Sequence, residues 1–143
     1  MLFSHVVTAF DGSVQAWRAL EYAIKLAENG LAERLSVVHV YNVPYMVVPE
    51  ATIYAPAELQ KEMYDRAEAL LAEAGKRTAH LLHAKLELMQ GSPADSLLQY
   101  ADKHGAALIV IGSRGLGGLR EFMMGSVSHN VVQHASVPVL VIK

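Results

Sequence analysis

Residues 106–115, AALIVIGSRG, are separated by nine residues from Gly125-Ser126. The run Ala106–Ile111 has the length and apolar composition of a buried strand, and Val127–Ala135 has a helical pattern. The glycines therefore join a strand to the N-terminus of a helix. Glycine lets a ligand approach the backbone there, and the first N–H groups of a helix favour an anion. This spacing is typical of a phosphate-holding loop, although a simple turn with Ser126 as helix N-cap would give the same pattern.

The composition limits the possible classes of protein. A chain of 143 residues, 52% of them hydrophobic, is predicted to form one domain over residues 1–143 with a sizeable core. The net charge is -2, and its 12 basic and 14 acidic residues are spread along the chain, which disfavours nucleic acid as a partner. No apolar run approaches the roughly 18 residues that span a bilayer, so we expect no membrane association and a cytoplasmic location. The absence of cysteine excludes disulfides and thiolate chemistry.

Strand-like and helical segments alternate along the rest of the chain. Apolar runs predict further strands at Phe3–Phe10, Leu35–Tyr41, Ala84–Gln90 and Val139–Ile142. Helices are predicted between the strands from apolar residues at three-and-four spacing, with stop signals at Asn29-Gly30 and Gly105. The segment Asn42–Pro56 contains three prolines and is predicted to be a largely irregular loop.

The alternation predicts an α/β fold, a doubly wound open sheet of five mostly parallel strands with helices on both faces. The strand order of such a sheet reverses at one point, and ligands bind there, beyond the carboxyl ends of the strands. Asp11 and Gly112 each follow a predicted strand at such an end. One cleft would therefore collect a carboxylate and the glycine loop if the two strands are neighbours, but the spacing alone does not establish this.

These residues together resemble the universal stress protein family. The resemblance covers the whole chain and rests on Asp11-Gly12-Ser13, on Gly112-x-x-Gly115 with Gly125-Ser126, on Gly91-Ser-Pro-Ala-Asp95 and on the closing segment Val137–Ile142. It implies a parallel sheet in the order 3-2-1-4-5, which makes the strands before Asp11 and Gly112 neighbours. Because every glycine of the motif and the following serine are present, the chain is most similar to the ATP-binding branch of the family.

The resemblance also implies roles for individual residues. Asp11 would lie by the adenosine and Val40 in the adenine pocket, and the glycines with Ser126 would surround the ribose and phosphates. The predicted nucleotide-binding set is Ala9, Asp11, Val40, Gly112, Arg114, Gly115, Met124, Gly125, Ser126 and Val127. Two alternatives remain open for members of this set. Asp11 can simply stabilise its turn, and Met124 can either pack in the core or form an apolar wall of the pocket.

The expected cofactor is ATP. The sequence has no P-loop lysine pattern, so backbone N–H groups and a divalent cation, Mg²⁺ or Mn²⁺, would have to balance much of the phosphate charge. The metal would arrive with the nucleotide, because histidines such as His80 and His129 have no acidic neighbours at ligand spacing. No residue is predicted to be catalytic, since neither a general base nor a nucleophile accompanies the glycine loop.

The partners and the function follow as expectations. Nothing after Val139–Ile142 covers the outer edge of that strand, which predicts a homodimer, and the resemblance implies antiparallel pairing of the final strands. The favoured function is an ATP-binding regulator or sensor in the stress response, with little or no hydrolysis alone, that acts on an unidentified protein partner. The alternatives are a slow ATPase or nucleotidyl-transfer enzyme, and a nucleotide-independent protein-interaction module.

Overall fold

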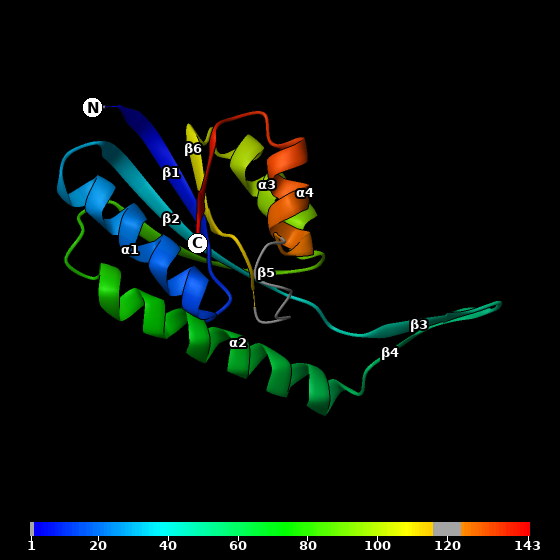
Figure 1. The fold of residues 1–143 in the computed structure, drawn as a ribbon. Coiled ribbons are helices and arrows are strands. Elements are labelled where there is room, and N and C mark those ends of the chain that lie inside the picture. The colour runs from blue at the N-terminus through cyan, green and yellow to red at the C-terminus, as the bar shows by residue number, and fades with distance from the viewer. Residues whose placement is uncertain (1, 116–123) are drawn as a thin grey trace.

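The computed structural model describes residues 2–115 and 124–143. Within these residues, five parallel strands form the main sheet (Figure 1). In chain order they are β1 (Phe3–Ala9), β2 (Ala32–Tyr41), β5 (Ala84–Gln90), β6 (Leu108–Gly112) and β7 (Val139–Ile142). Their order across the sheet is β5-β2-β1-β6-β7, which is 3-2-1-4-5 when the five strands are numbered along the chain. The predicted fold class and strand order are confirmed.

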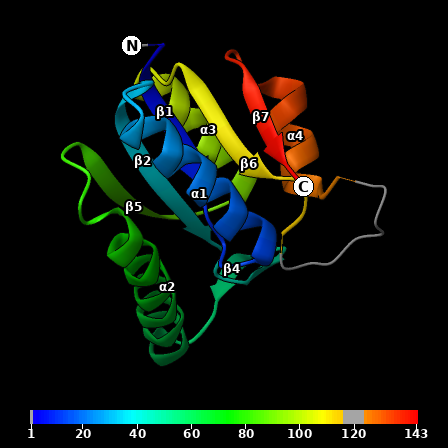
Figure 2. The same cartoon turned by 60° about the vertical axis from the view of Figure 1, so that its left-hand side comes forward.

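Helices cover both faces of this sheet, as Figures 1 and 2 show. One face carries α1 (Val14–Glu28) and α2 (Ala57–Thr78), and the other carries α3 (Pro93–Lys103) and α4 (Ser126–His134). Successive residues of the central strand β1 therefore face different cores. Val6 packs with the residues of α1 and α2, and Val7 packs with those of α3 and α4; both are 0% exposed. Because both of its faces are buried, β6 is apolar along its whole length.

The structure corrects the prediction for Asn42–Pro56. This segment contains a β-hairpin, β3 (Tyr45–Val48) paired antiparallel with β4 (Ala51–Tyr54), and it is not a largely irregular loop. Its three prolines lie outside both strands, one before β3, one in the turn and one before α2, so none removes an N–H group from the ladder. Between the prolines the runs Tyr-Met-Val-Val and Ala-Thr-Ile-Tyr are rich in β-formers.

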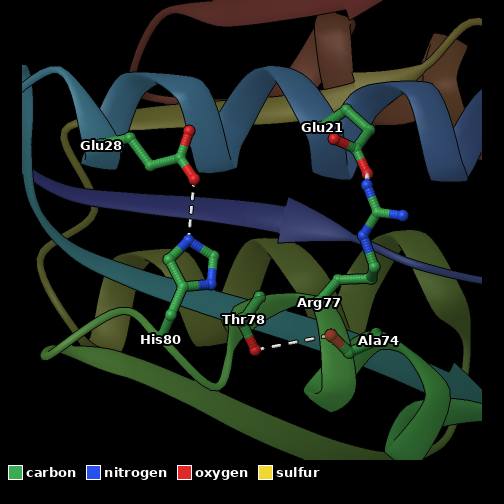
Figure 3. Close-up of polar contacts among 6 residues, drawn as sticks. All are labelled: Glu21, Glu28, Ala74, Arg77, Thr78 and His80. Atoms are coloured by element: carbon green, nitrogen blue, oxygen red, sulfur yellow. Dashed lines mark hydrogen bonds and ion pairs between the residues drawn. The ribbon is translucent and has the colours of Figure 1, made fainter.

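An ion pair and a hydrogen bond connect α1 with the end of α2 and the turn that follows it (Figure 3). Arg77 pairs with Glu21, and His80 Nε2 lies 2.7 Å from Glu28 Oε1. The four side chains are between 37% and 55% exposed, so water screens both pairs and each contributes at most about 1 kcal/mol. The attachment of α2 to the sheet therefore depends mainly on its buried residues Ala67, Leu71 and Ala74.

A buried polar network crosses from the sheet to α3 at the end of the sheet where the β1 strand begins. Tyr100 donates its hydroxyl to Ser36 Oγ at 3.2 Å, and Ser36 Oγ lies 2.8 Å from His5 Nε2. His5 Nδ1 lies 3.1 Å from the carbonyl oxygen of His104, which can only accept, so Nδ1 carries the proton and Nε2 accepts from Ser36. Burial lowers the pKa of His5, and the network suits its neutral form.

One buried hydroxyl has no hydrogen-bond partner within the described part of the chain. It is Oγ1 of Thr8, a residue of β1 that is 0% exposed. A buried hydroxyl without a partner costs about 1–3 kcal/mol in lost hydration. We therefore expect Thr8→Val, which replaces the hydroxyl with a methyl group of similar size, to raise the free energy of unfolding by about 1 kcal/mol. Urea unfolding measures this change.

Thr78→Val provides the matched control. The Thr78 side chain is also buried, but its hydroxyl lies 3.3 Å from the carbonyl oxygen of Gly75 and 3.4 Å from that of Ala74. The same substitution removes hydrogen bonds at this position and should give no gain in stability. A loss of stability in Thr8→Val would show that its hydroxyl is satisfied in solution.

Candidate functional site

The carboxyl ends of β1 and β6 lie side by side, because these two strands pair directly. A cavity of about 450 Å³ opens there, where the strand order reverses. A cavity of this size is large enough for a small-molecule ligand. Nine of the ten residues predicted to bind nucleotide line it: Ala9, Asp11, Val40, Gly112, Arg114, Gly115, Gly125, Ser126 and Val127.

The tenth residue, Met124, lies outside the lining. It precedes the N-cap of α4 and is 36% exposed. Eight of the nine residues between Gly115 and Gly125 fall outside the described part of the chain, which contains the two ends of the loop. Within residues 2–115 and 124–143, no group of three or more histidine and acidic side chains is placed to hold a metal ion.

One end of the cavity is apolar. Val38 and Val40 point to the same face of β2 because side chains alternate along a strand, and Leu97 of α3 and Ile111 of β6 complete this surface. Three of these four side chains are buried, and Val40 packs against the same cluster. One face of a flat ring can pack against this surface, which excludes water from that face.

The other end of the cavity is built from backbone groups. The N–H of Gly125 donates to the carbonyl oxygen of Ser113 at 2.7 Å, and the N–H of Ser113 donates to that of Ile142 at 2.7 Å. The hydroxyl of Ser128 donates to the carbonyl oxygen of Gly112 at 2.5 Å. These bonds hold the first turn of α4 against the end of β6. Backbone hydrogen bonds therefore hold the two ends of the glycine loop next to each other.

The N-terminus of α4 faces this cavity without a side-chain cap. Gly125 is the N-cap and Ser126 is the first helical residue, and the structure of residues 2–115 and 124–143 shows no side-chain cap there. The alternative in which Ser126 is the N-cap therefore differs from the structure, where Gly125 has that position. The first turn of an uncapped helix attracts an anion through its N–H groups and its dipole. An exposed Ser126 hydroxyl lies at the same place.

Two glycines allow close packing at the turn between β6 and α4. A Cβ atom on Gly115 would collide with Oδ2 of Asp11. A Cβ atom on Gly125 would lie 3.4 Å from Cα of Arg114 and 3.6 Å from the nitrogen of Gly115, so it would rest against the loop. Glycine at position 115 therefore lets the Asp11 carboxylate approach the loop backbone, and glycine at position 125 lets the start of α4 pack against the loop.

Asp11 connects the two halves of the site. Its Oδ1 accepts the N–H of Ser13 at 2.9 Å, and Ser13 Oγ accepts the N–H of Ala16 as the N-cap of α1. The intervening Gly12 has φ +82°, which disfavours other residues. The turn-forming role of Asp11 is thus present in the structure. Its other carboxylate oxygen faces Gly115, and the same side chain lines the cavity.

His39 supports this turn from the opposite face of β2. Its Nδ1 lies 2.7 Å from the carbonyl oxygen of Phe10, so Nδ1 carries a proton and donates it. The side chain is 8% exposed. Burial lowers the pKa of His39, while the bond to Phe10 and the charge of Asp11 act in the opposite direction. The backbone just before Asp11 is therefore held by a buried neutral imidazole.

The two buried histidines predict a pH dependence of stability. Both His5 and His39 have a pKa below the ordinary value of 6.5 in the folded chain, so the unfolded chain binds protons first as pH falls. Their contribution to stability is complete above pH 6.5 and is lost as pH falls below it. The free energy of unfolding should fall by up to about 1.4 kcal/mol per pH unit for each histidine.

NMR titration of the imidazole resonances tests this prediction directly, together with urea unfolding at a series of pH values. Two histidine signals should titrate below pH 6.5, and His39→Gln should remove one of them. Constant stability between pH 8 and 5 would contradict the assignment.

Several cavity residues were not predicted from the sequence: Phe10, Ser13, Ala16, Pro93, Leu97 and Ser128, with Val38 and Ile111 in the apolar wall. The alternation of side chains in β2 could have indicated Val38 once Val40 was placed. Pro93 and Leu97 belong to α3, whose position over β2 depends on the tertiary fold. The role of His39 has no local sequence signal, because its partner is a backbone carbonyl 29 residues away.

Residues 2–143 match the model of the Universal stress protein family. The chain belongs to the universal stress protein family. Universal stress protein YxiE of Bacillus subtilis is 35% identical to it over 149 residues, which cover 99% of this chain and 100% of YxiE.

Solved structures share the universal stress protein fold. The structure of MJ0577, a protein of Methanocaldococcus jannaschii, superposes with a TM-score of 0.81 at 22% identity and covers 100% of this chain and 97% of that one. A universal stress protein from Archaeoglobus fulgidus superposes with a TM-score of 0.66 at 26% identity, with both chains fully covered, and was solved in complex with dAMP. The structural comparison agrees with the family match.

Proposed function

We propose that this universal stress protein binds ATP in the cavity between the ends of β1 and β6. The observation that carries the proposal is the cavity of about 450 Å³ at these strand ends, which is lined by Val38 and Val40 and by the glycines of the loop. A further support is the relative from Archaeoglobus fulgidus, which was solved with dAMP, a nucleotide with the same base. No helix in the described part of the chain is long and apolar enough to cross a membrane.

The residues fit an adenine nucleotide at both ends of the cavity. Adenine would occupy the apolar end at Val38 and Val40, and the ribose would lie near Asp11. The phosphates would lie at Gly112–Gly115 and at the uncapped N-terminus of α4, with Arg114 nearby. Mg²⁺ or Mn²⁺ would be carried by the phosphates and complete the balance of charge.

The proposed role is regulatory. Nucleotide occupancy would fill the cavity beside the glycine loop and so change the surface that a protein partner meets, in a cytoplasmic stress response with little or no hydrolysis by the protein alone. The edge strand β7, whose Leu140 is 39% exposed, is the proposed site of homodimer pairing. A single nucleotide site on each subunit would then report the nucleotide state of the cell.

The deciding experiment is to purify the protein without added nucleotide, denature it and identify any released small molecule by chromatography and mass spectrometry. ATP or ADP near one per chain would support the proposal, and a high share of ADP would indicate turnover. An empty protein that also fails to bind added ATP with Mg²⁺ would overturn it. The regulatory role requires in addition that a captured partner is lost when nucleotide is removed.

A further inference from the structure

The hairpin β3–β4 is an apolar projection from the molecule. We call residues 45–54 the arm. Its strands pair only with each other, as a two-stranded sheet separate from the main one, and Figure 1 shows it directed away from the body of the fold. Isolated two-stranded hairpins are at best marginally stable in water. The arm therefore needs a further surface to become a stable element.

The side chains of the arm are unusually apolar for an exposed segment. Tyr45, Met46, Val47, Ile53 and Tyr54 are between 51% and 69% exposed. The register puts Tyr45, Val47, Thr52 and Tyr54 on one face, and Met46, Val48, Ala51 and Ile53 on the other. Neither face is polar enough to be a normal solvated surface, and a concentration of exposed apolar residues of this kind marks an interaction site.

The base of the arm is fixed, although the arm itself is exposed. Val43, two residues before β3, is 5% exposed, and Gln60 Nε2 donates to the carbonyl oxygen of Ala55 at 2.7 Å. The backbone N–H of Gln60 also donates to the carbonyl oxygen of Pro56 at 3.0 Å. An arm that leaves a fixed base loses less conformational entropy when it binds than a free loop would.

The charge of the arm limits the kind of partner. Glu50, in the turn, is the one charged residue between Val43 and Pro56. Nucleic acid and anionic lipid would meet this carboxylate at the tip and find no basic group to bind. A partner with an apolar, β-rich and nearly uncharged surface is required, and a second copy of the same arm has these properties.

We propose that the arm binds the arm of a second copy of this chain. The outer edges of β3 and β4 are both unpaired in the two-stranded sheet, so an identical arm can add to it about a two-fold axis. The five exposed large apolar side chains offer roughly 600 Å² per copy, given areas near 200 Å² for aromatic residues. Two copies therefore offer up to about 1,200 Å², the lower limit for a specific interface.

This contact differs from the homodimer edge proposed for β7. The arm follows β2, and β1 and β6 lie between β2 and β7 in the sheet. A chain with two separate two-fold contacts forms tetramers or longer assemblies, and one contact alone gives dimers. Because the area is small, association through the arm should be weak and should depend on protein concentration.

The test is the mass in solution of Val47→Glu/Ile53→Glu, measured by sedimentation velocity over a wide range of concentrations. The two positions lie on opposite faces of the arm and are not opposite each other, since Val47 pairs with Thr52 and Ile53 with Met46. At high concentration the mass of the wild type should exceed that of the variant by about twofold. The control Leu2→Glu/Leu82→Glu, at side chains 68% and 88% exposed, should keep the wild-type mass.

A charge-reversed pair distinguishes arm-to-arm contact from other contacts. Val47→Lys/Ile53→Lys should also remain at the lower mass, and an equal mixture of the lysine and glutamate variants should recover the higher mass. Equal masses for wild type and both arm variants would overturn the proposal and leave the arm to a different protein. If the mixture does not recover the higher mass, the proposal is also overturned, because the arm then contacts another part of the second copy. Neither result depends on nucleotide binding.

Discussion

Gly115→Val should abolish the binding of adenine nucleotide and leave the protein folded. A Cβ atom at this position collides with Oδ2 of Asp11, and a β-branched side chain also fills the space beside the loop. Gly115 is exposed and does not have a positive φ, so valine meets little backbone strain. We expect the Kd for ATP, measured by isothermal titration calorimetry, to rise by roughly a hundredfold or more, a loss of about 3 kcal/mol.

Gly105→Ala is the control for this prediction. Gly105 has φ +65° and nothing within 4 Å of a Cβ atom, and it precedes β6 at the opposite end of the sheet from the cavity. Alanine there costs about 1 kcal/mol of stability through backbone strain alone. It should lower the unfolding midpoint and leave the affinity for ATP unchanged. Wild-type affinity in Gly115→Val would refute the assignment of the loop, and equal losses of affinity in both variants would attribute the effect to stability.

The positions of most elements could be predicted from local sequence. Ala84–Gln90 and Val139–Ile142 are strands with the predicted bounds; the first alternates apolar and charged residues from Ala84 to Leu88, and the second is a short apolar run. Glu28 ends α1 just before the predicted stop at Asn29-Gly30, and Gly30 has φ +70°. The order of the strands could not be obtained from local patterns, because it depends on contacts between distant segments. It came from the family resemblance.

The site was predictable where it depends on backbone chemistry and less so where it depends on packing. Gly112, Gly115 and Gly125 have a spacing that is visible in the sequence, and the structure brings them to one cavity. Leu97 lines the same cavity only because α3 crosses β2, which no local pattern indicates. The hairpin was missed for a different reason. The three prolines of Asn42–Pro56 predict an irregular segment, but only their positions relative to the strands decide whether a ladder can form.

Gly112→Ala should cause the largest loss of stability among the single substitutions considered. Gly112 is buried at the end of β6, where α1 begins. A Cβ atom there would lie 2.8 Å from Cβ of Gln15, 2.9 Å from its carbonyl carbon and 3.0 Å from its carbonyl oxygen. Two of these atoms belong to the backbone of a helix and cannot move alone, so the first turn of α1 must shift. Overpacking of this kind costs about 3 kcal/mol.

Gly125→Ala separates this clash from a general intolerance of side chains at the site. Gly125 is buried like Gly112, but its nearest neighbour would lie 3.4 Å from a Cβ atom, which is close to ordinary contact. We expect it to lose less than about 1 kcal/mol in urea unfolding, with the same dependence on urea as the wild type. Because the shift of α1 also moves the Asp11–Ser13 turn against the loop, Gly112→Ala should weaken ATP binding even in the folded fraction. Equal stability of the two variants would mean that β6 and α1 do not pack this closely in solution.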